Sequence, residues 1–233
     1  MISKIAIIIT AAGSSTRMGS GIKKEYLPFQ NGTVLSTCAT TFLKACSKKY
    51  TITDFIITCP INKNIECEKA LNIDKDFVNL KNQYLSSSSF CITNGSSTRQ
   101  KSVYNALLAI KNEPDLVIIH DGARPFVTTD LIIKTIEEAF LYGAAVPGLT
   151  PTDTQKEIDE NGFITRHLKR ASLCAVQTPQ AFIYKKLLEA HKLCSNEESE
   201  YTDDTEIWGK YVGNVKVVSG DLHNKKITYK GDL

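Results

Sequence analysis

The order of apolar and polar positions in the first part of the chain predicts strands alternating with helices. The centre of Lys4–Thr10 is continuously apolar, which is typical of a strand buried on both faces. In Val34–Ala45 the apolar residues recur at helical spacing instead. Later segments repeat this alternation, with strands expected at Asp54–Cys59, Phe90–Thr93, Leu116–Ile119 and Ala144–Leu149, and helices at Ser97–Ile110 and Asp130–Phe140. The pattern predicts an α/β fold: a mostly parallel sheet with helices on both faces.

The character of the chain changes between Thr150 and Leu173, where threonine and charged residues dominate. Asn161-Gly162 is a strong signal for a hairpin turn between residues 151–157 and 163–169. An isolated hairpin is only marginally stable, so we expect it to pack on something else. Further helices and a late strand follow, at Tyr184–Leu193, Thr202–Trp208 and Val215–Val218. We expect one domain over residues 1–233, with a hairpin arm at about 150–172.

Composition and charge exclude several classes of protein. The chain is 42% apolar, and its formal net charge is only +3, so a disordered chain or a dedicated nucleic-acid binder is not expected. No apolar stretch is long enough for a membrane span, and the first apolar run is too short for a signal peptide. The seven cysteines form no CxxC motif, which argues against a disulfide framework or zinc site and favours a reducing, cytoplasmic compartment.

Candidate chemistry begins in the loop after the first strand, Ala11–Gly19. Small residues around Gly13 allow backbone N–H groups to approach a phosphate chain closely, and Arg17 supplies a fork of donors for phosphate oxygens. Lys23 and Lys24 follow in the same connection. The loop matches neither a Walker A motif nor GxGxxG, and a surface turn with solvated cations is the alternative interpretation.

Two further loops follow predicted strands, and in α/β sheets ligands bind outside the carboxyl ends of the strands. Asp121, after the Leu116–Ile119 strand, is placed to hold Mg²⁺ or a sugar hydroxyl, and Arg124 is placed to meet a phosphate. The alternative is a local ion pair between these two residues. Ser96 and Ser102 lie at the start of a predicted helix, where helix capping alone competes with contacts to a base edge.

Six motifs appear in order along the chain: Ala-Ala-Gly-x-x-x-Arg-Met-x-x-x-x-x-Lys-x-Tyr-Leu, Arg-x-x-Ser-Val, His-Asp-x-Ala-Arg-Pro, Asp-Thr-x-Lys, Gln-Thr-Pro-Gln-x-Phe and Thr-Asp-Asp. Together they resemble the 2-C-methyl-D-erythritol 4-phosphate cytidylyltransferase family over nearly the whole chain. The resemblance implies a Rossmann-like nucleotidyltransferase fold and homodimers, with the hairpin as a dimerisation arm. It also implies CTP and Mg²⁺, and transfer of CMP to methylerythritol phosphate in non-mevalonate isoprenoid biosynthesis.

The same resemblance assigns roles to individual positions. Contacts to CTP fall on Ala11, Ala12, Gly13, Ser14, Ser96 and Ser102. The cations at the reacting phosphates are Arg17, Lys24 and Lys226, with Lys225 as the alternative to Lys226. Contacts to methylerythritol phosphate fall on Asp121, Arg124, Thr154 and Arg170, and Asp121 is also the candidate metal ligand.

The chain departs from the family pattern at several positions. Ser15 stands where the family commonly has glycine, and Lys23 and Glu25 replace the usual proline and glutamine around Lys24. Ser97 replaces a common aspartate near the base. The residues Tyr229–Gly231 replace a basic residue followed by Pro-Glu, and the family commonly continues into a terminal helix, so truncation or membership of a longer protein is an open expectation.

Two other functions are consistent with parts of the pattern. A ribitol 5-phosphate cytidylyltransferase typically shows Leu-Ala-Gly-Gly in the first loop and a Ser-Val pair after the aspartate, whereas this chain has Ala11-Ala12-Gly13 and Gly122-Ala123. A non-catalytic nucleotide-binding module of the same fold is the other alternative. Retention of every candidate cation argues against that module.

Overall fold

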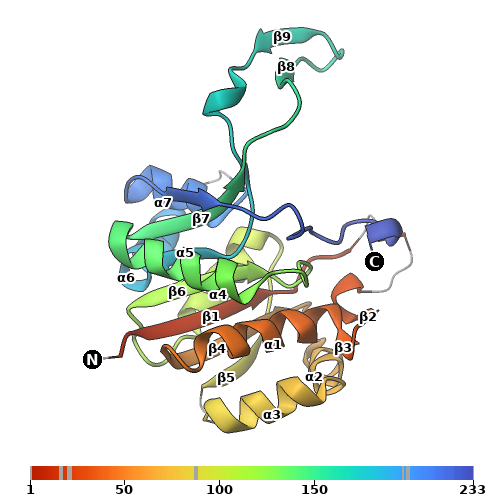
Figure 1. Cartoon of the computed structure of the whole chain (residues 1–233), viewed down its shortest axis with the longest axis vertical. Helices are drawn as coiled ribbons and strands as arrows, with labels where there is room; N and C mark the ends of the chain where they lie inside the picture. The colour runs from red at the N-terminus through yellow and green to blue at the C-terminus, as the bar shows by residue number, and fades with distance from the viewer. Residues whose placement is uncertain are drawn as a thin grey trace.

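The structure is a computed structural model and describes residues 2–15, 18–19, 23–86, 89–195, 197 and 200–232. Its centre is an eight-stranded sheet in the order β10-β7-β11-β6-β1-β4-β5, with β12 also paired to β7 (Figure 1). The strands are β1 (Lys4–Thr10), β4 (Thr51–Cys59), β5 (Phe90–Asn94), β6 (Leu116–Asp121), β7 (Ala144–Leu149), β10 (Ala175–Val176), β11 (Gln180–Ile183) and β12 (Lys216–Ser219). The pairs β1–β4, β1–β6, β4–β5 and β7–β12 are parallel. The predicted α/β class and mostly parallel sheet are therefore confirmed.

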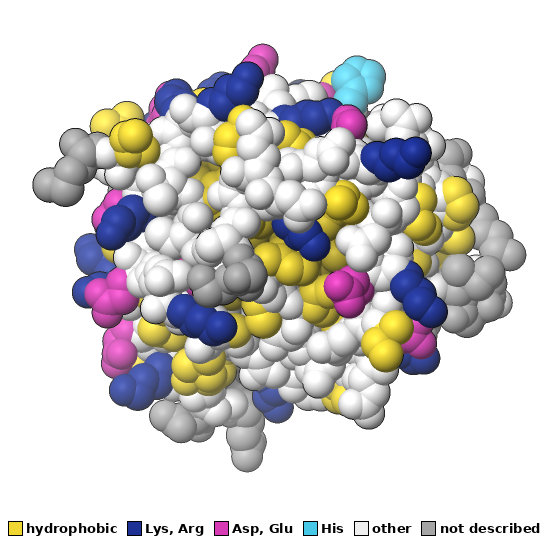
Figure 2. Space-filling view, turned by 90° about the horizontal axis from the view of Figure 1, so that it is seen from below, with side chains coloured by type: hydrophobic (Ala, Val, Ile, Leu, Met, Phe, Trp, Pro, Cys, Tyr) yellow, Lys and Arg dark blue, Asp and Glu magenta, His cyan; other side chains and the backbone are white. Residues whose placement is uncertain are grey.

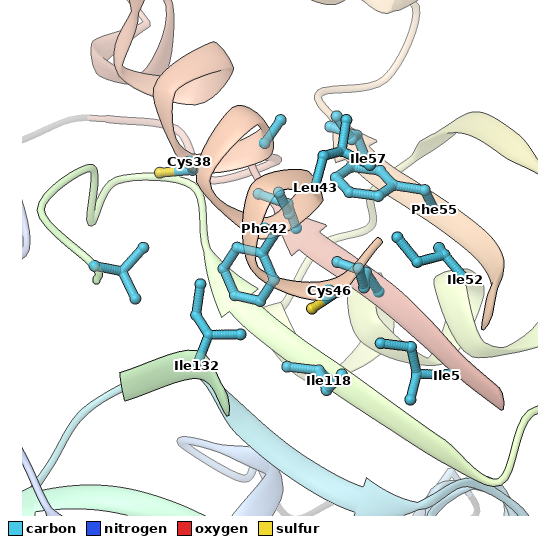
Figure 3. Packing of buried hydrophobic residues seen from close by; sticks show 14 of the residues in the cluster. Ile5, Cys38, Phe42, Leu43, Cys46, Ile52, Phe55, Ile57, Ile118 and Ile132 are labelled. Carbon is cyan, nitrogen blue, oxygen red and sulfur yellow. The ribbon is translucent and has the colours of Figure 1, made fainter. Parts of the chain in front are cut away.

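Strand β1 is buried on both faces of the sheet, as its apolar run predicts. Ile5, Ile7 and Ile9 pack into one hydrophobic cluster, while Ala6 and Ile8 pack into another. The first cluster, seen from close by in Figure 3, is covered by α1 (Val34–Cys46), α2 (Asn64–Asn72), α3 (Lys75–Tyr84) and α5 (Thr129–Tyr142). The second is covered by α4 (Arg99–Leu108), α6 (Tyr184–Cys194) and α7 (Asp204–Tyr211). Because each face carries its own core, β1 needs apolar side chains at consecutive positions.

Side-chain caps mark the starts of α1, α3, α4, α5 and α7. Thr33 and Ser36 form a capping box at the start of α1, in which each side chain bonds the other residue's backbone N–H. The hydroxyl of Thr98 accepts a hydrogen bond from the backbone N–H of Lys101. For this reason α4 begins at Arg99, whereas the apolar pattern predicted a start at Ser97.

The sequence pattern did not identify strand β11. This strand runs antiparallel between β6 and β7, and it carries only four residues, which is too few to show a period. Strand β10 precedes it along the same edge of β7. The patterns of α2 and α3 were also missed, because these helices are largely polar and bury few residues.

The predicted hairpin is present as β8 (Lys156–Ile158) and β9 (Ile164–His167), which pair antiparallel. Figure 1 shows this arm extending away from the body of the molecule. All residues of both strands are exposed, and the arm's exposed apolar side chains are Ile158 and Ile164 in the strands and Phe163 in the connection between them. The arm therefore makes no hydrophobic core within this chain.

On the face seen from the end opposite the arm, basic and acidic side chains are interspersed around hydrophobic side chains near the centre (Figure 2). Lys81 of α3 makes one such contact between a basic and an apolar side chain, since its amine lies 5.1 Å from the ring centroid of Phe90 in β5. Within the described ranges, no helix combines the length and the apolar character needed to cross a bilayer.

Replacing Phe42 by alanine should lower the free energy of unfolding by about 3–5 kcal/mol, because it removes a fully buried ring from the core between α1 and the sheet. The ring lies 4.9 Å from that of His120, so the cavity would open directly beneath the loop after β6. Urea unfolding of the purified variant measures the effect. Leu141→Ala is the control, since that side chain is 74% exposed and its loss should change stability by less than about 0.5 kcal/mol. Equal losses in both variants would contradict this account of the core.

Candidate active site

The main cavity lies at the carboxyl ends of β1, β4, β5 and β6 and has a volume of about 390 Å³. Its wall combines the loop after β1, the short helix η2 (Lys24–Tyr26), the start of α4, the loop after β6 and the C-terminal segment. The described lining residues are Thr10, Ala12, Gly13, Ser14, Ser15, Lys24, Glu25, Thr58, Ser96, Ser97, Arg99, Ser102, Asp121, Ala123, Lys226 and Thr228. This is the edge at which a parallel α/β sheet is expected to bind its ligand.

The loop after β1 forms an open wall of the cavity. A Cβ atom added to Gly13 would meet no protein atom within 4 Å, so space is left beside its backbone. Ser15 has a φ of 54°, in the left-handed region that glycine adopts more easily. Its hydroxyl lies 3.3 Å from Glu25 Oε2 and accepts a 3.4 Å contact from the backbone N–H of Lys24. Serine therefore adopts here the conformation that a glycine would favour.

Two lysines enter the cavity from opposite ends of the sequence. The amine of Lys24 is buried and donates a 2.7 Å hydrogen bond to the carbonyl of Ile227. The backbone N–H of Ile227 in turn donates to the carbonyl of Ala123, after β6. These bonds place Lys226, and not Lys225, at the cavity, where its amine lies 2.7 Å from Asp121 Oδ2.

Asp121 is a buried carboxylate surrounded by three cationic side chains. Besides Lys226, Arg124 Nε lies 3.6 Å from Oδ2 and Arg99 Nε lies 3.7 Å from Oδ1. Burial alone would raise the pKa of Asp121, but the charges of Lys226, Arg99 and Arg124 outweigh burial and hold the pKa well below its usual range. Asp121 is therefore ionised at neutral pH and holds three cations beside the cavity.

Arg99 is a cavity residue to which the sequence analysis assigned no role. Its Nη1 atom donates a 2.7 Å hydrogen bond to Asp204 Oδ2, and Asp204 Oδ1 accepts a 3.0 Å bond from His191 Nε2. Burial would raise the pKa of Asp204, but Arg99 and His191 hold it below its usual value. Both residues belong to quoted motifs, Arg-x-x-Ser-Val and Thr-Asp-Asp, so a signal was present in the sequence. Only the fold brings α4 and α7 together around this ion pair.

The serines predicted to face a base lie together at the start of α4. The hydroxyl of Ser102 accepts a 2.9 Å hydrogen bond from the backbone N–H of Ser96 and donates to the carbonyl of Thr98. A Cβ atom on Gly95 would lie 2.2 Å from the Cβ of Ala12, so glycine is required where these two loops meet. The loop after β1 and the loop before α4 therefore form one continuous wall.

His120 supports the loop after β6 from below and is fully buried. Its Nε2 atom lies 3.2 Å from the carbonyl of Arg124, which can only accept, so Nε2 carries the proton. The hydroxyl of Thr178 accepts from the backbone N–H of Asp121 and lies 3.0 Å from His120 Nδ1, to which it donates. Acceptance of a hydrogen bond at Nδ1 requires a neutral imidazole. In agreement, burial lowers the pKa of His120 to about 4.

The structure brings together most of the predicted site residues but not all. Ala12, Gly13, Ser14, Lys24, Ser96, Ser102, Asp121 and Lys226 line one cavity. Arg124 lies behind Asp121 and donates to the carbonyl of Asn224, while Ala11 is buried beside the cavity. Arg17 falls outside the described residues. Thr154 and Arg170 lie exposed on the arm, where Arg170 donates to the carbonyl of Thr152, so they do not join this cavity within one chain.

The donor set at Asp121 suits a magnesium ion that arrives with phosphates. Among the described residues, its Oδ1 atom has only long contacts, 3.4 Å to the hydroxyl of Thr10 and 3.7 Å to Arg99 Nε, which leaves room for a cation at this oxygen. Over the described ranges, no group of three or more metal-binding side chains occurs. Mg²⁺ is commonly held by one or two carboxylates together with substrate phosphates and water, and one carboxylate fits that pattern.

Stability should fall as the pH is lowered from 7 to 4, partly because of His120. Its pKa is about 4 in the folded protein and near 6.5 in the unfolded chain, so between these values the unfolded state binds the extra proton. The resulting loss in the free energy of unfolding should reach about 3 kcal/mol at pH 4. Urea unfolding in EDTA at several pH values compares the native chain with His120→Gln, which can still donate to Arg124. The variant should lose less stability over this window; identical pH profiles would contradict the assignment.

Comparisons with known proteins agree with this geometry. The family model described as 2-C-methyl-D-erythritol 4-phosphate cytidylyltransferase matches residues 5–233. A relative of that name from Clostridium tetani is 40% identical over 233 residues, covering 100% of this chain and 88% of the relative. Another from Clostridium botulinum is 36% identical over 231 residues, covering 99% of this chain and 95% of the relative.

A solved structure also matches the whole fold. The crystal structure of 4-diphosphocytidyl-2C-methyl-D-erythritol synthase from Anaerococcus prevotii superposes with a TM-score of 0.78 at 28% identity, covering 99% of this chain and 92% of that one. The family match, the full-length relatives and the arrangement of the cavity lead to the same conclusion. The chain belongs to the 2-C-methyl-D-erythritol 4-phosphate cytidylyltransferase family.

Proposed function

We propose that this chain transfers CMP from CTP to 2-C-methyl-D-erythritol 4-phosphate, giving the CDP-alcohol and pyrophosphate, in isoprenoid biosynthesis. Membership of the family supports this reaction and does not favour ribitol 5-phosphate as the acceptor. The structural observation that carries the proposal is the cavity itself, in which Lys24, Arg99 and Lys226 face an open glycine loop at the carboxyl edge of the sheet. Such a wall suits two phosphate-bearing substrates.

The reaction needs positioning and charge neutralisation more than proton transfer. The phosphate of the acceptor is a dianion and already a nucleophile, so it can attack the α-phosphorus of CTP in line while pyrophosphate leaves. His120, directly before Asp121, is neutral and committed to two structural hydrogen bonds, so it is not placed to act as a base. Fixed cations lower the barrier because negative charge shifts toward the leaving pyrophosphate and the bridging oxygens.

Individual roles follow from position along the cavity. Ser96, Ser102 and Ala12 form the end that we assign to cytidine, and the backbone after Gly13 forms the triphosphate wall. Lys24 donates to the carbonyl of Ile227, and Lys226 lies 2.7 Å from Asp121; we assign this part of the wall to the reacting phosphates. Arg17 is proposed as a further cation at these phosphates on the strength of its motif alone.

Asp121 and Arg124 are proposed to bind the acceptor alcohol phosphate. Asp121 would also hold Mg²⁺, which supplies charge neutralisation on the triphosphate when it is bound. In the absence of these ligands the carboxylate is occupied by Lys226 at 2.7 Å. Binding of a phosphate would give this lysine a second anionic partner without moving it from the cavity wall.

A homodimer would complete the site. Thr154 and Arg170 lie on an exposed arm that carries unburied apolar side chains, and an arm of this kind is stabilised by packing on a second copy. In such a dimer the arm of one chain would reach over the cavity of the other and deliver Arg170 to the acceptor phosphate. We also propose that the enzyme works in the cytoplasm, the reducing compartment in which free cysteines persist.

Lys24→Ala should lower kcat by roughly 100-fold or more, with a smaller effect on the KM for CTP, because the lost amine acts mainly on charge that builds in the transition state. Pyrophosphate release from CTP is the measurement, with 2-C-methyl-D-erythritol 4-phosphate and ribitol 5-phosphate compared as acceptors. Release with neither acceptor by the native chain would favour a non-catalytic nucleotide-binding module. A kcat within a few-fold of native in the variant would remove Lys24 from the proposed mechanism.

Mixing two inactive variants tests whether the arm acts across the dimer. Lys24→Ala and Arg170→Ala chains should each be inactive, whereas a mixed dimer should regain one intact site, formed by Lys24 of one chain and Arg170 of the other. Activity should therefore appear only on co-assembly. If heterodimers form, as shown by differently tagged chains, and activity does not return, Arg170 does not act in trans.

A further inference from the structure

A carboxylate lines the cavity assigned to the triphosphate. Glu25, in the short helix η2, is 4% exposed and belongs to the cavity wall beside Ser15 and Lys24. A triphosphate brings several negative charges into the same enclosed space, where like charges repel more strongly than in water. An uncompensated Glu25 would therefore oppose nucleotide binding.

The compensation comes from Lys23, the residue two positions earlier. Its amine lies 2.9 Å from Glu25 Oε2, and the two side chains are 12% and 5% exposed. The same amine donates to the carbonyl of Gly13, in the loop after β1. Lys23 is not among the described residues that line the cavity, although Glu25 is. The lysine thus lies against the carboxylate and the loop, outside the lining of the cavity.

Ser15, in the loop after β1, also contacts Glu25 Oε2. Its hydroxyl lies 3.3 Å from Glu25 Oε2, while its own backbone is in the left-handed region with a φ of 54°. Ser15, Lys23 and Glu25 are three positions at which this chain departs from the family pattern, which commonly has glycine, proline and glutamine there. The structure unites these separate departures in one hydrogen-bonded cluster. A neutral glutamine would need no counter-ion, whereas a buried glutamate does.

We propose that Lys23 is the counter-ion of Glu25 and not a phosphate ligand, and that this pair positions the loop of Gly13 and Ser15 while cancelling the negative charge of Glu25 in the wall of the triphosphate site. The proposal extends the assigned function to a determinant of nucleotide affinity, and it rests on the proposed binding of CTP. Lys23 acts through Glu25, so both are positioning residues and neither takes part in the transfer step.

Charge removal at Lys23 should weaken CTP binding, and removal of both charges should restore it. Calorimetric titration with CTP in Mg²⁺ would compare the native chain with Lys23→Met, Lys23→Gln, Glu25→Gln and the double variant Lys23→Met/Glu25→Gln. Both Lys23 variants should raise the Kd by about tenfold, since each leaves Glu25 unpaired beside the phosphates. Glutamine retains a donor for the carbonyl of Gly13, so equal losses would identify the charge as the cause. The double variant should return to within about threefold of native.

Two further readouts separate this role from a merely structural one. The loss caused by Lys23→Met should be larger for CTP than for CMP, because repulsion grows with phosphate charge, and kcat at saturating CTP should stay within a few-fold of native. Lys185→Met is the matched control: its amine pairs with Glu113 at 2.8 Å on the exposed surface, so its removal should leave CTP affinity unchanged.

The outcomes distinguish the possibilities. A double variant as weak as Lys23→Met would show that Lys23 binds phosphate directly, and Lys23 variants with native affinity would show that Glu25 needs no counter-ion; either result overturns the proposal. Failure of the native chain and the Lys185→Met control to bind CTP would instead contradict the proposed function. Circular dichroism melts of each variant confirm that binding is compared between folded proteins.

Discussion

The buried carboxylate of Asp121 is the interaction on which the rest of the site depends. It ends β6, and its charge holds Lys226, Arg99 and Arg124 within 2.7 to 3.7 Å. Each of those cations comes from a different part of the chain: the C-terminal segment, the start of α4 and the loop after β6. Without an anion at this point, three positive side chains would repel one another across a half-buried space. The carboxylate therefore assembles the cations before any phosphate arrives.

Neighbouring residues hold the backbone of Asp121 in place and balance the charges around it. Thr178, after β10, accepts from its backbone N–H, and His120 orients that hydroxyl through a neutral ring. On the far side of Arg99, Asp204 balances the guanidinium charge within α7. The pattern recurs at Glu25, whose charge is balanced by Lys23. Around the cavity, the buried carboxylates of Asp121, Asp204 and Glu25 each lie beside a cation, which offsets the cost of burying them.

The hydrophobic pattern of the sequence predicts some elements of the structure and not others. Strands β1, β4, β6 and β7 were predicted to within a few residues, because each contains a run of buried residues that are mostly apolar. Helix α1 was predicted because one face of it packs on the core, which gives its apolar residues helical spacing. Strand β11 was not predicted, since four residues are too few to show an alternation of apolar and polar positions. Helices α2 and α3 were not predicted because they bury too few residues to show an apolar face. At the site, Gly13 and Asp121 were singled out in loops after strands, and the family resemblance assigned a role to Lys24. Arg99 received no role, because the neighbouring Ser96 and Ser102 were interpreted as a helix cap or as contacts to a base edge.

The amino-acid sequence by itself determined the α/β class, the hairpin, the family and the segments that carry the chemistry, since these depend on local periodicity and on motifs contiguous in the chain. Only the tertiary structure decided how distant segments meet. It placed Lys226 and not Lys225 at Asp121, joined Arg99 to Asp204 across α4 and α7, and gathered Ser15, Lys23 and Glu25 around one carboxylate oxygen. It also left Thr154 and Arg170 on an exposed arm, apart from the cavity of their own chain. The physical reason is that buried charges are paired through space: Lys226 and Asp121, like Arg99 and Asp204, are far apart in the sequence and meet only when the chain folds.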